Sequence, residues 1–263
     1  TVPGMVSNNI WSVADNGDGK LYIGHVFDGF SVLSIKDRKI KNFRHNPADP
    51  KSLPSDGVMC VYADKDGNII DPFGGMTDIQ KKQIRCVGSA EKRFSEDALR
   101  ILRALRFSSV LGFSIEHDTT RAIRNNKNLL FNIARERICK EYSQLLVGVN
   151  TADVLLGFPD VVAISFPELW ECVGFEQNNP YHCYDVYRHI VESVRNIEPD
   201  LVLRLTMLLH DPGNPEYKTM DEDGVAHFKM HALGSERIAK EVLRRLKFDN
   251  DTLHKVTRLV LNH

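Results

Sequence analysis

The stretch RFSEDALRILRALRF, residues 93–107, decides the fold class of most of the chain. Its apolar residues recur at three- and four-residue intervals, as Leu99 and Leu102 do, and this period predicts an amphipathic α-helix. Ser95 or Asp97 is suited to open that helix, because short polar side chains accept hydrogen bonds from the first backbone N–H groups of a helix. The stretch therefore indicates an α-helical region.

Charged residues of this helix follow a step of three, at Asp97, Arg100, Arg103 and Arg106. Neighbours in such a row lie close together on the helix surface. Three arginines repel one another unless anions or carboxylates lie among them, so the row predicts phosphate binding. A carboxylate beside an arginine can also hydrogen-bond the edge of a base. An ordinary solvated helix face, with Asp97 paired to a neighbouring arginine, is the alternative that the spacing leaves open.

The same helical periodicity continues from Asp71 to the end of the chain, for example at Leu129, Ile133 and Ile138. Residues 1–69 follow a different pattern, in which short apolar runs alternate with turn signals such as residues 16–19. This pattern repeats, since residues 7–19 align with residues 55–67 at an interval of about 50 residues, which is typical of propeller blades. The two patterns join within residues 67–75.

Composition excludes several classes of protein. Of the 263 residues, 42% are apolar and 26% are charged, which is typical of globular domains. No apolar run approaches the about 20 residues that a membrane helix needs, so we expect no membrane association. The five cysteines form no C-x-x-C pair, which argues against a disulfide framework and a thiolate zinc site and favours a cytoplasmic protein. The net charge of −1 hides a basic region at residues 80–145.

Motifs around the basic helix match one family. They are D-P-F-G-G at residues 71–75, R-x-V-G at 85–88, E-D-A-L-R at 96–100, L-G-F at 111–113 and R-E-R-I-x-x-E at 135–141. With these motifs, residues 70–263 resemble the neck, body and HD domain of class II tRNA nucleotidyltransferases, the CCA-adding and poly(A) polymerase family. Residues 1–69 instead resemble propeller blades of the sensor of hybrid two-component regulators.

The first resemblance implies a role for the basic helix. In that family the Glu-Asp-x-x-Arg motif is a protein template for incoming CTP or ATP, which implies Asp97 and Arg100 as base-binding residues. It also implies Arg103 and Arg106 as further nucleotide contacts, tRNA as the partner and Mg²⁺ as the metal of the parent enzymes.

Catalysis in this family uses an Asp-x-Asp pair that follows a Gly-Ser turn. Two Asp-x-Asp strings occur, at residues 64–66 and 221–223, but each lies in a glycine-ended turn, where turn chemistry explains the aspartates. We therefore assign no catalytic residue and expect this chain not to catalyse nucleotide addition. Because the chain opens on Thr1, we expect a fragment or a processed product.

Histidines gather in the last third of the chain. The doublet His210-Asp211 ends an apolar helix, and His189 lies on the helix before it. Imidazoles with a carboxylate suit a divalent metal that activates water for phosphate-ester hydrolysis, although structural histidines fit the spacing equally. Resemblance to an HD domain implies His189, His210 and Asp211 as metal ligands. Pro212 departs from that pattern and is expected to turn the Asp211 carboxylate away.

Together these observations predict a mixed fold, a short β segment followed by a mainly all-α region. The predicted divisions are a propeller-like segment at 1–69, a nucleotide- and RNA-binding neck and body at 70–170, and a truncated HD domain at 171–263. The leading hypothesis is a fragment of a CCA-adding tRNA nucleotidyltransferase that acts with ATP and CTP. The alternatives are a metal-dependent HD-type phosphohydrolase and a non-enzymatic, sensor-derived binding module.

Overall fold

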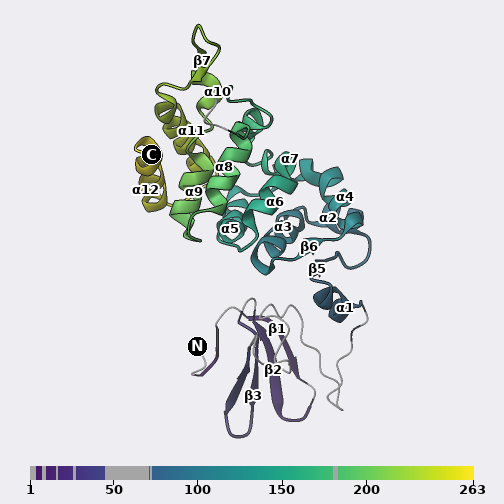
Figure 1. Cartoon of the computed structure of the whole chain (residues 1–263). Coiled ribbons are helices and arrows are strands. Elements are labelled where there is room, and N and C mark those ends of the chain that lie inside the picture. The colour runs from purple at the N-terminus through teal and green to yellow at the C-terminus, as the bar shows by residue number, and fades with distance from the viewer. Residues whose placement is uncertain are drawn as a thin grey trace. The chain divides into compact units, whose positions relative to one another are not determined.

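The computed structural model describes residues 4–7, 10–15, 17–25, 28–44, 71, 73–179 and 183–263. Its contacts divide the chain into two compact units, Thr1–Lys82 and Gln83–His263, which are described separately. Figure 1 shows strands in the first unit and a mainly helical second unit. The predicted mixed fold class is therefore confirmed at this level.

The first unit contains a four-stranded antiparallel sheet in which neighbours in sequence are neighbours in space. Its strands are β1 (Ile10–Asp15), β2 (Lys20–His25), β3 (Phe30–Ser34) and β4 (Ile40–Phe43). The predicted turn between β1 and β2 forms because Gly17 and Gly19 adopt positive φ angles of 78° and 77°. The Asp15 carboxylate accepts the Gly17 backbone N–H at 2.8 Å and stabilises this turn.

The propeller interpretation of residues 1–69 stays a prediction. The second copy of the repeat, residues 55–67, lies outside the described residues, as do residues 67–70 of the predicted join. On the described side of the join, the Asp71 carboxylate accepts the backbone N–H groups of Gly75 (2.7 Å) and Met76 (2.8 Å). These bonds begin the short helix α1 (Gly75–Gln80).

The second unit is built from helices around one core of buried apolar side chains, which runs from Phe94 to Val260. Its longer helices are α2 (Ala90–Glu96), α3 (Leu99–Leu111), α4 (His117–Asn126), α5 (Arg135–Leu146), α6 (Thr151–Gly157), α8 (Val186–Arg195), α9 (Leu201–Leu209), α11 (His231–Arg245) and α12 (Asn250–Leu261). Shorter pieces are η1 (Lys127–Asn132), α7 (Pro159–Val162), η2 (Pro167–Cys172) and α10 (Asn214–Tyr217). Two small ladders join β5 (Gln83–Ile84) to β6 (Ser114–Ile115) and β7 (Thr219–Met220) to β8 (Ala226–His227).

This core is shared by residues on both sides of position 170, so the division into 70–170 and 171–263 stays a functional prediction. Helix α3 packs on α5, and α9 packs on both α8 and α12. No helix in the described part of the chain is both long enough and apolar enough to span a bilayer.

The decisive stretch at 93–107 differs from the prediction of one helix. The structure divides it into α2 and α3, because Asp97 is extended (φ −151°, ψ 100°). Its Oδ1 accepts the backbone N–H of Leu99 at 3.1 Å, so Asp97 stabilises the start of α3. The prediction that Asp97 can open a helix is right, and the helix that it opens starts two residues later.

Candidate functional site

The corner between α2 and α3 carries a small network of opposite charges. The Glu96 carboxylate accepts hydrogen bonds from Arg93 and Arg100, each at 2.9 Å. Arg100 also donates to the Arg93 carbonyl at 2.8 Å. The hydrogen bond from Arg100 holds the pKa of Glu96 below its usual value. These contacts fix the Arg100 guanidinium beside the backbone of the corner.

Asp97 lies in the same corner and contacts a second helix. One carboxylate oxygen faces the start of α3, and the other lies 3.5 Å from Nη2 of Arg137 on α5. The structure thus places Asp97 and Arg100 at one corner and adds Arg137 to them, but Asp97 precedes α3 and does not share a helical row with Arg100 as the sequence predicted. Arg137 belongs to the R-E-R-I-x-x-E motif at residues 135–141, but the spacing of residues along the chain does not show that α5 packs on α3.

Arg103 and Arg106 lie further along α3. Arg103 is half-buried. Arg106 is buried at the contact with α5, where its Nε lies 3.3 Å from the Glu141 carboxylate, and it donates a hydrogen bond to Gln144. Burial lowers the pKa of Arg106 and raises the pKa of Glu141, although the attraction between them opposes both shifts. Arg106 therefore joins α3 to α5, and its predicted contact with a nucleotide stays a prediction.

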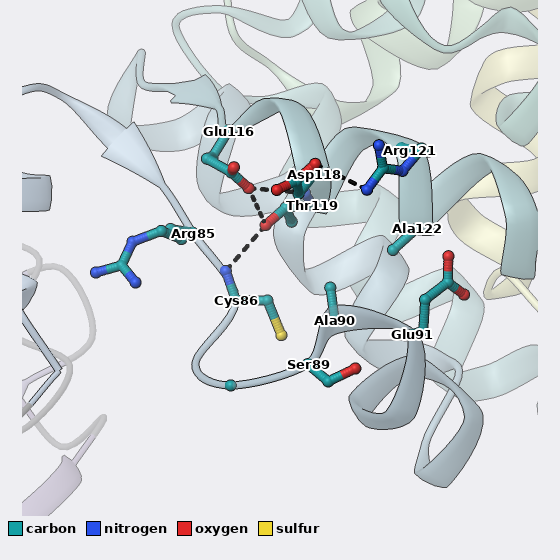
Figure 2. A pocket seen from close by; sticks show the side chains of 11 residues that line it. Arg85, Cys86, Ser89, Ala90, Glu91, Glu116, Asp118, Thr119, Arg121 and Ala122 are labelled. Atoms are coloured by element: carbon teal, nitrogen blue, oxygen red, sulfur yellow. Dashed lines mark hydrogen bonds and ion pairs between the residues drawn. The ribbon is translucent and has the colours of Figure 1, made fainter.

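A cavity of about 360 Å³ lies between the starts of α2 and α4 (Figure 2). Thr119 connects its walls, because its hydroxyl accepts the Cys86 backbone N–H (3.1 Å) and contacts the Glu116 carboxylate (2.9 Å). Its charged lining residues are Arg85, Glu91, Glu116, Asp118 and Arg121. Because charges of both signs are mixed here, the cavity does not select for anions such as nucleotide phosphates.

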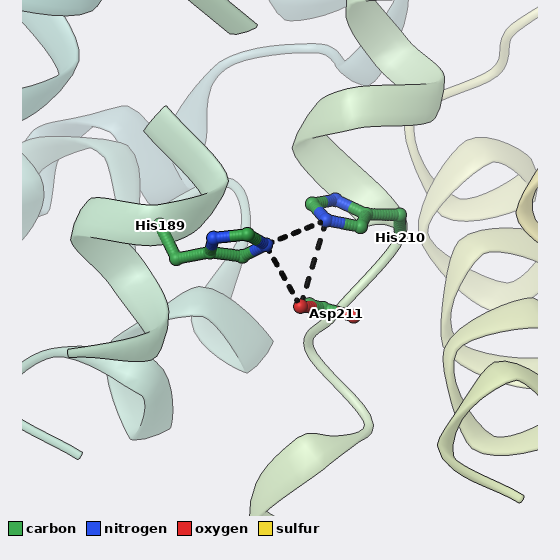
Figure 3. A group of neighbouring side chains, drawn as sticks. All are labelled: His189, His210 and Asp211. Carbon is green, nitrogen blue, oxygen red and sulfur yellow. Dashed lines mark hydrogen bonds and ion pairs between the residues drawn. The ribbon is translucent and has the colours of Figure 1, made fainter. Parts of the chain in front are cut away.

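The second candidate site brings together the three predicted metal ligands (Figure 3). Nε2 of His189 on α8 lies 3.3 Å from Oδ2 of Asp211, and Nε2 of His210 lies 3.5 Å from the same oxygen. The two Nε2 atoms lie 3.2 Å apart. Pro212 does not turn the carboxylate away: Asp211 is buried and faces both rings, so that expectation was wrong.

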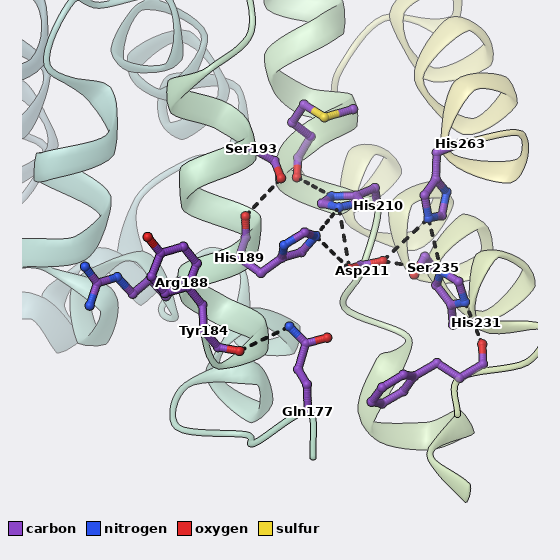
Figure 4. Close-up of polar contacts among 12 residues, drawn as sticks. Gln177, Tyr184, Arg188, His189, Ser193, His210, Asp211, His231, Ser235 and His263 are labelled. Carbon is purple, nitrogen blue, oxygen red and sulfur yellow. Dashed lines mark hydrogen bonds and ion pairs between the residues drawn. The ribbon is translucent and has the colours of Figure 1, made fainter. Parts of the chain in front are cut away.

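Two further histidines face Asp211 from the other side (Figure 4). Nε2 of His231, at the start of α11, lies 3.4 Å from Oδ1 of Asp211, and Nε2 of His263, just after α12, lies 3.5 Å from it. Neither histidine was predicted as a ligand from the sequence. No local signal predicts the contact, because it depends on the packing of α11 against α12.

Electrostatics keep the Asp211 carboxylate charged. Burial alone would raise the pKa of Asp211, but hydrogen bonds from His189 and His263 and the nearby imidazoles hold it well below its usual value. Burial lowers the pKa of His210, which favours the neutral ring that a metal ligand requires. The site therefore combines a buried anion with imidazoles.

In the part of the chain that the structure describes, acidic groups outside the histidine cluster do not form a metal site. Among the described residues, two groups of side chains are placed to hold an ion, namely His189, His210 and Asp211, and Asp211, His231 and His263. Mg²⁺ prefers oxygen ligands in octahedral geometry, so neither imidazole-rich group fits it. The Asp221 carboxylate accepts the backbone N–H groups of Asp223 and Val225, which confirms turn chemistry for that Asp-x-Asp string. The string at 64–66 lies outside the described residues.

Comparison with known proteins gives a consistent relationship. The family described as "Probable RNA and SrmB- binding site of polymerase A" matches residues 112–156. A CCA-adding enzyme of Leuconostoc citreum is 56% identical over 156 residues, which are 59% of this chain and 38% of the relative. Another, from Geobacillus thermodenitrificans, is 52% identical over 98 residues, which are 37% of this chain and 24% of the relative.

A solved structure extends the similarity to the fold. The CCA-adding enzyme of Bacillus stearothermophilus in complex with CTP superposes with a TM-score of 0.50 at 25% identity, over 95% of this chain and 56% of that one. The chain thus spans less than two fifths of the length of the two curated relatives above. Sequence and fold together relate this chain to the CCA-adding enzymes.

Proposed function

We propose that the helical unit is the nucleotide-reading and RNA-binding part of a CCA-adding tRNA nucleotidyltransferase, with CTP, ATP and tRNA as its ligands. The observation that carries this proposal is the corner at which Asp97 and Arg100 are held by Arg137 and Glu96. The match of residues 112–156 to an RNA-binding family model supports the tRNA partner.

The chemistry of the corner suits the two bases that carry an amino group at C4 of the pyrimidine or C6 of the purine, which are cytosine and adenine. This amino group can donate a hydrogen bond to a carboxylate such as that of Asp97, whereas uracil and guanine carry a carbonyl oxygen at that position. The Arg100 guanidinium can donate to the neighbouring ring nitrogen. Arg103 and Arg106, which lie on the same helix α3, belong to the proposed nucleotide site as well. Their positive charge would stabilise the phosphates of the bound nucleotide. Transfer itself is proposed to need catalytic carboxylates beyond those found in this sequence.

Nucleotide binding tests this function directly. We expect the chain to bind CTP and ATP more tightly than UTP and GTP in calorimetric titrations. Arg100→Ala should weaken CTP and ATP binding by about 10- to 150-fold, because a hydrogen bond to a charged group contributes about 1.5–3 kcal/mol. Arg258→Ala, an exposed arginine on α12, is the control for lost charge. Equal affinity of wild type and Arg100→Ala for both nucleotides would refute the proposal.

A second proposed function is metal-dependent hydrolysis of phosphate esters, as in HD domains. It rests on the cluster of His189, His210 and Asp211. A divalent metal there would supply an acidified water, while the side chains hold the ion and exclude bulk solvent. The expected results are loss of bound metal and of phosphodiesterase activity in His210→Ala. Unchanged metal content in that variant would contradict this function. The comparisons favour the nucleotidyltransferase relationship over an HD-type enzyme alone.

A further inference from the structure

We propose that His25 is a pH-sensitive latch in the first unit. While its ring is neutral, the latch keeps β4 and the segment at Gly4 attached to the sheet, and in acid it releases them. The latch lies within the β segment and is independent of the functions proposed for the helical unit. A buried imidazole at the start of a chain of hydrogen bonds carries it.

The chain of hydrogen bonds crosses three strands. Nε2 of His25 on β2 lies 2.8 Å from the hydroxyl oxygen of Ser31 on β3, and that hydroxyl donates to Oδ1 of Asn42 on β4 at 2.7 Å. The Asn42 amide donates in turn to the Gly4 carbonyl oxygen at 2.9 Å. Ser31 and Asn42 are opposite residues of the ladder, so the chain runs across one face of the sheet. It therefore joins β2, β3, β4 and the segment before β1.

The direction of these hydrogen bonds fixes the position of the proton on His25. A carbonyl oxygen only accepts, so Nδ2 of Asn42 faces Gly4 and its Oδ1 faces Ser31. The Ser31 hydrogen is thereby used, and its oxygen accepts from His25. In the neutral ring Nε2 then carries the hydrogen, and Nδ1 carries a lone pair. Nδ1 is buried and has no hydrogen-bond partner in the part of the chain that the structure describes.

Acid adds a proton at Nδ1, the ring atom that still has a lone pair. The new N–H is a buried donor without an acceptor, and the ring gains a charge although none of its residue is exposed to solvent. Water satisfies both the donor and the charge once the ring is exposed. Protonation therefore favours conformations in which His25 leaves its place, and these conformations also open the contacts of Ser31 and Asn42.

The charges near His25 do not compensate this cost. Burial lowers the pKa of His25, while the Asp28 carboxylate opposes the shift and the Arg44 guanidinium adds to it. Asp28 and Arg44 pair with each other at 2.6 Å, so the ring has neither charge to itself. The residue paired with His25 on β1 is the apolar Ile10, and β3 and β4 contribute the uncharged side chains described above.

The first unit should therefore become less stable in mild acid. Because the folded-state pKa of His25 is below the unfolded value of 6.5, its contribution is complete above that value and is lost as pH falls below it. Uptake of one proton on opening predicts an opening equilibrium up to about tenfold larger at about pH 5.5 than at about pH 7.5. Carboxylates stay largely ionised over this range, so they contribute little to the change.

The test is hydrogen–deuterium exchange of the full chain by mass spectrometry at these two pH values, corrected for the intrinsic exchange rate. Peptides from β2, β3 and β4 should lose up to about tenfold in protection in acid, and peptides from α3 and α5 are the internal reference. His25→Gln keeps a donor for Ser31 but does not titrate, so its protection should be equal at both values. His45→Gln is the matched control, because His45 is the other histidine of residues 1–82, and it should behave as wild type.

Equal protection of wild type at both pH values would overturn the latch. So would an acid-induced loss that persists in His25→Gln or disappears in His45→Gln, since another group would then be the one that titrates. If His25→Gln does not fold, NMR titration of the ring carbons in wild type decides the matter. A His25 pKa below 6.5 supports the latch, and a value at or above 6.5 overturns it.

Discussion

Arg137 on α5 places its Nη2 3.5 Å from Oδ2 of Asp97, while Oδ1 of Asp97 accepts the backbone N–H at the start of α3. Both carboxylate oxygens of Asp97 therefore have a partner, and the plane of the carboxylate is fixed. A base that docks at this corner meets an acceptor that is already oriented, so less conformational entropy is lost on binding. The motif that contains Arg137 thereby supports the residue proposed to read the base.

Replacement of Arg137 by Gln should weaken CTP and ATP binding by about two- to fivefold, because an exposed ion pair contributes up to about 1 kcal/mol. The effect should be smaller than that of Arg100→Ala. Calorimetric titration measures both. Lys140→Gln removes the same charge from the exposed side of α5 and should leave both affinities unchanged. Tighter binding by Arg137→Gln, or an equal loss in Lys140→Gln, would show that Arg137 does not orient Asp97.

The buried pair of Arg106 and Glu141 predicts an asymmetric response to mutation. Glu141→Gln leaves the Arg106 charge buried without its counter-ion, and it should lower the free energy of unfolding by about 3–5 kcal/mol. Urea unfolding followed by the helical circular dichroism signal measures this. Burial shifts the pKa of each partner in the direction that favours its neutral form. Removal of both charges in Arg106→Met/Glu141→Leu should therefore lower the free energy of unfolding less than Glu141→Gln does. If the double variant is the less stable of the two, the pair stabilises α3 on α5 more than burial opposes it.

Glu96 provides a pH-dependent signal for the state of Arg100. Its pKa is lowered mainly by the hydrogen bond from Arg100, and more weakly by the charge of Arg93. Because the folded-state pKa is below the unfolded value, this contact stabilises the corner above the unfolded pKa, and its contribution is lost as pH falls through the folded pKa. A carboxyl NMR titration should show the Glu96 pKa rising in Arg100→Gln.

The same titration contains its own control. Arg93→Gln should raise the Glu96 pKa less than Arg100→Gln does. Arg100 bonds both Glu96 and the Arg93 carbonyl through Nη1, so saturating CTP should raise the Glu96 pKa if this group turns to the base. A Glu96 pKa that does not change with CTP would mean that Arg100 keeps its contact with Glu96 and that the base is bound by other donors.

Local periodicity was sufficient to predict the helical character of residues 93–107 and 201–209, since both patterns depend only on neighbours in sequence. Capping preference offered Asp97 as a helix start, but hydrophobic spacing did not show that a separate helix ends at Glu96, because it does not register that the Asp97 side chain accepts the Leu99 backbone N–H. Because the chain turns at this break, Glu96 contacts Arg100 and Asp97 contacts Arg137.

The candidate metal cluster shows a similar limit. Its first half was predicted because His210 and Asp211 are adjacent and His189 lies on the preceding helix. His231 and His263 reach the same carboxylate only because α11 packs on α12, and this contact joins residues far apart in the chain. Such long-range contacts depend on how the helices pack around the shared core, so the spacing of residues along the chain does not predict them.

The connection between α5 and α6, inside the segment matched to an RNA-binding family model, depends on the absence of a side chain at Gly148. A Cβ there would lie 2.1 Å from Oγ of Ser109 and 2.6 Å from its backbone carbonyl carbon, so α3 and the connection would have to move apart. Gly148→Ala should therefore lower the free energy of unfolding by about 1–3 kcal/mol in urea unfolding.

Gly157→Ala is the matched control, because nothing lies within 4 Å of a Cβ at this last residue of α6. That variant should be unchanged or more stable by up to about 1 kcal/mol, since alanine favours the helix over glycine. Equal stability of the two variants would mean that α3 can yield to the added methyl group without loss of packing.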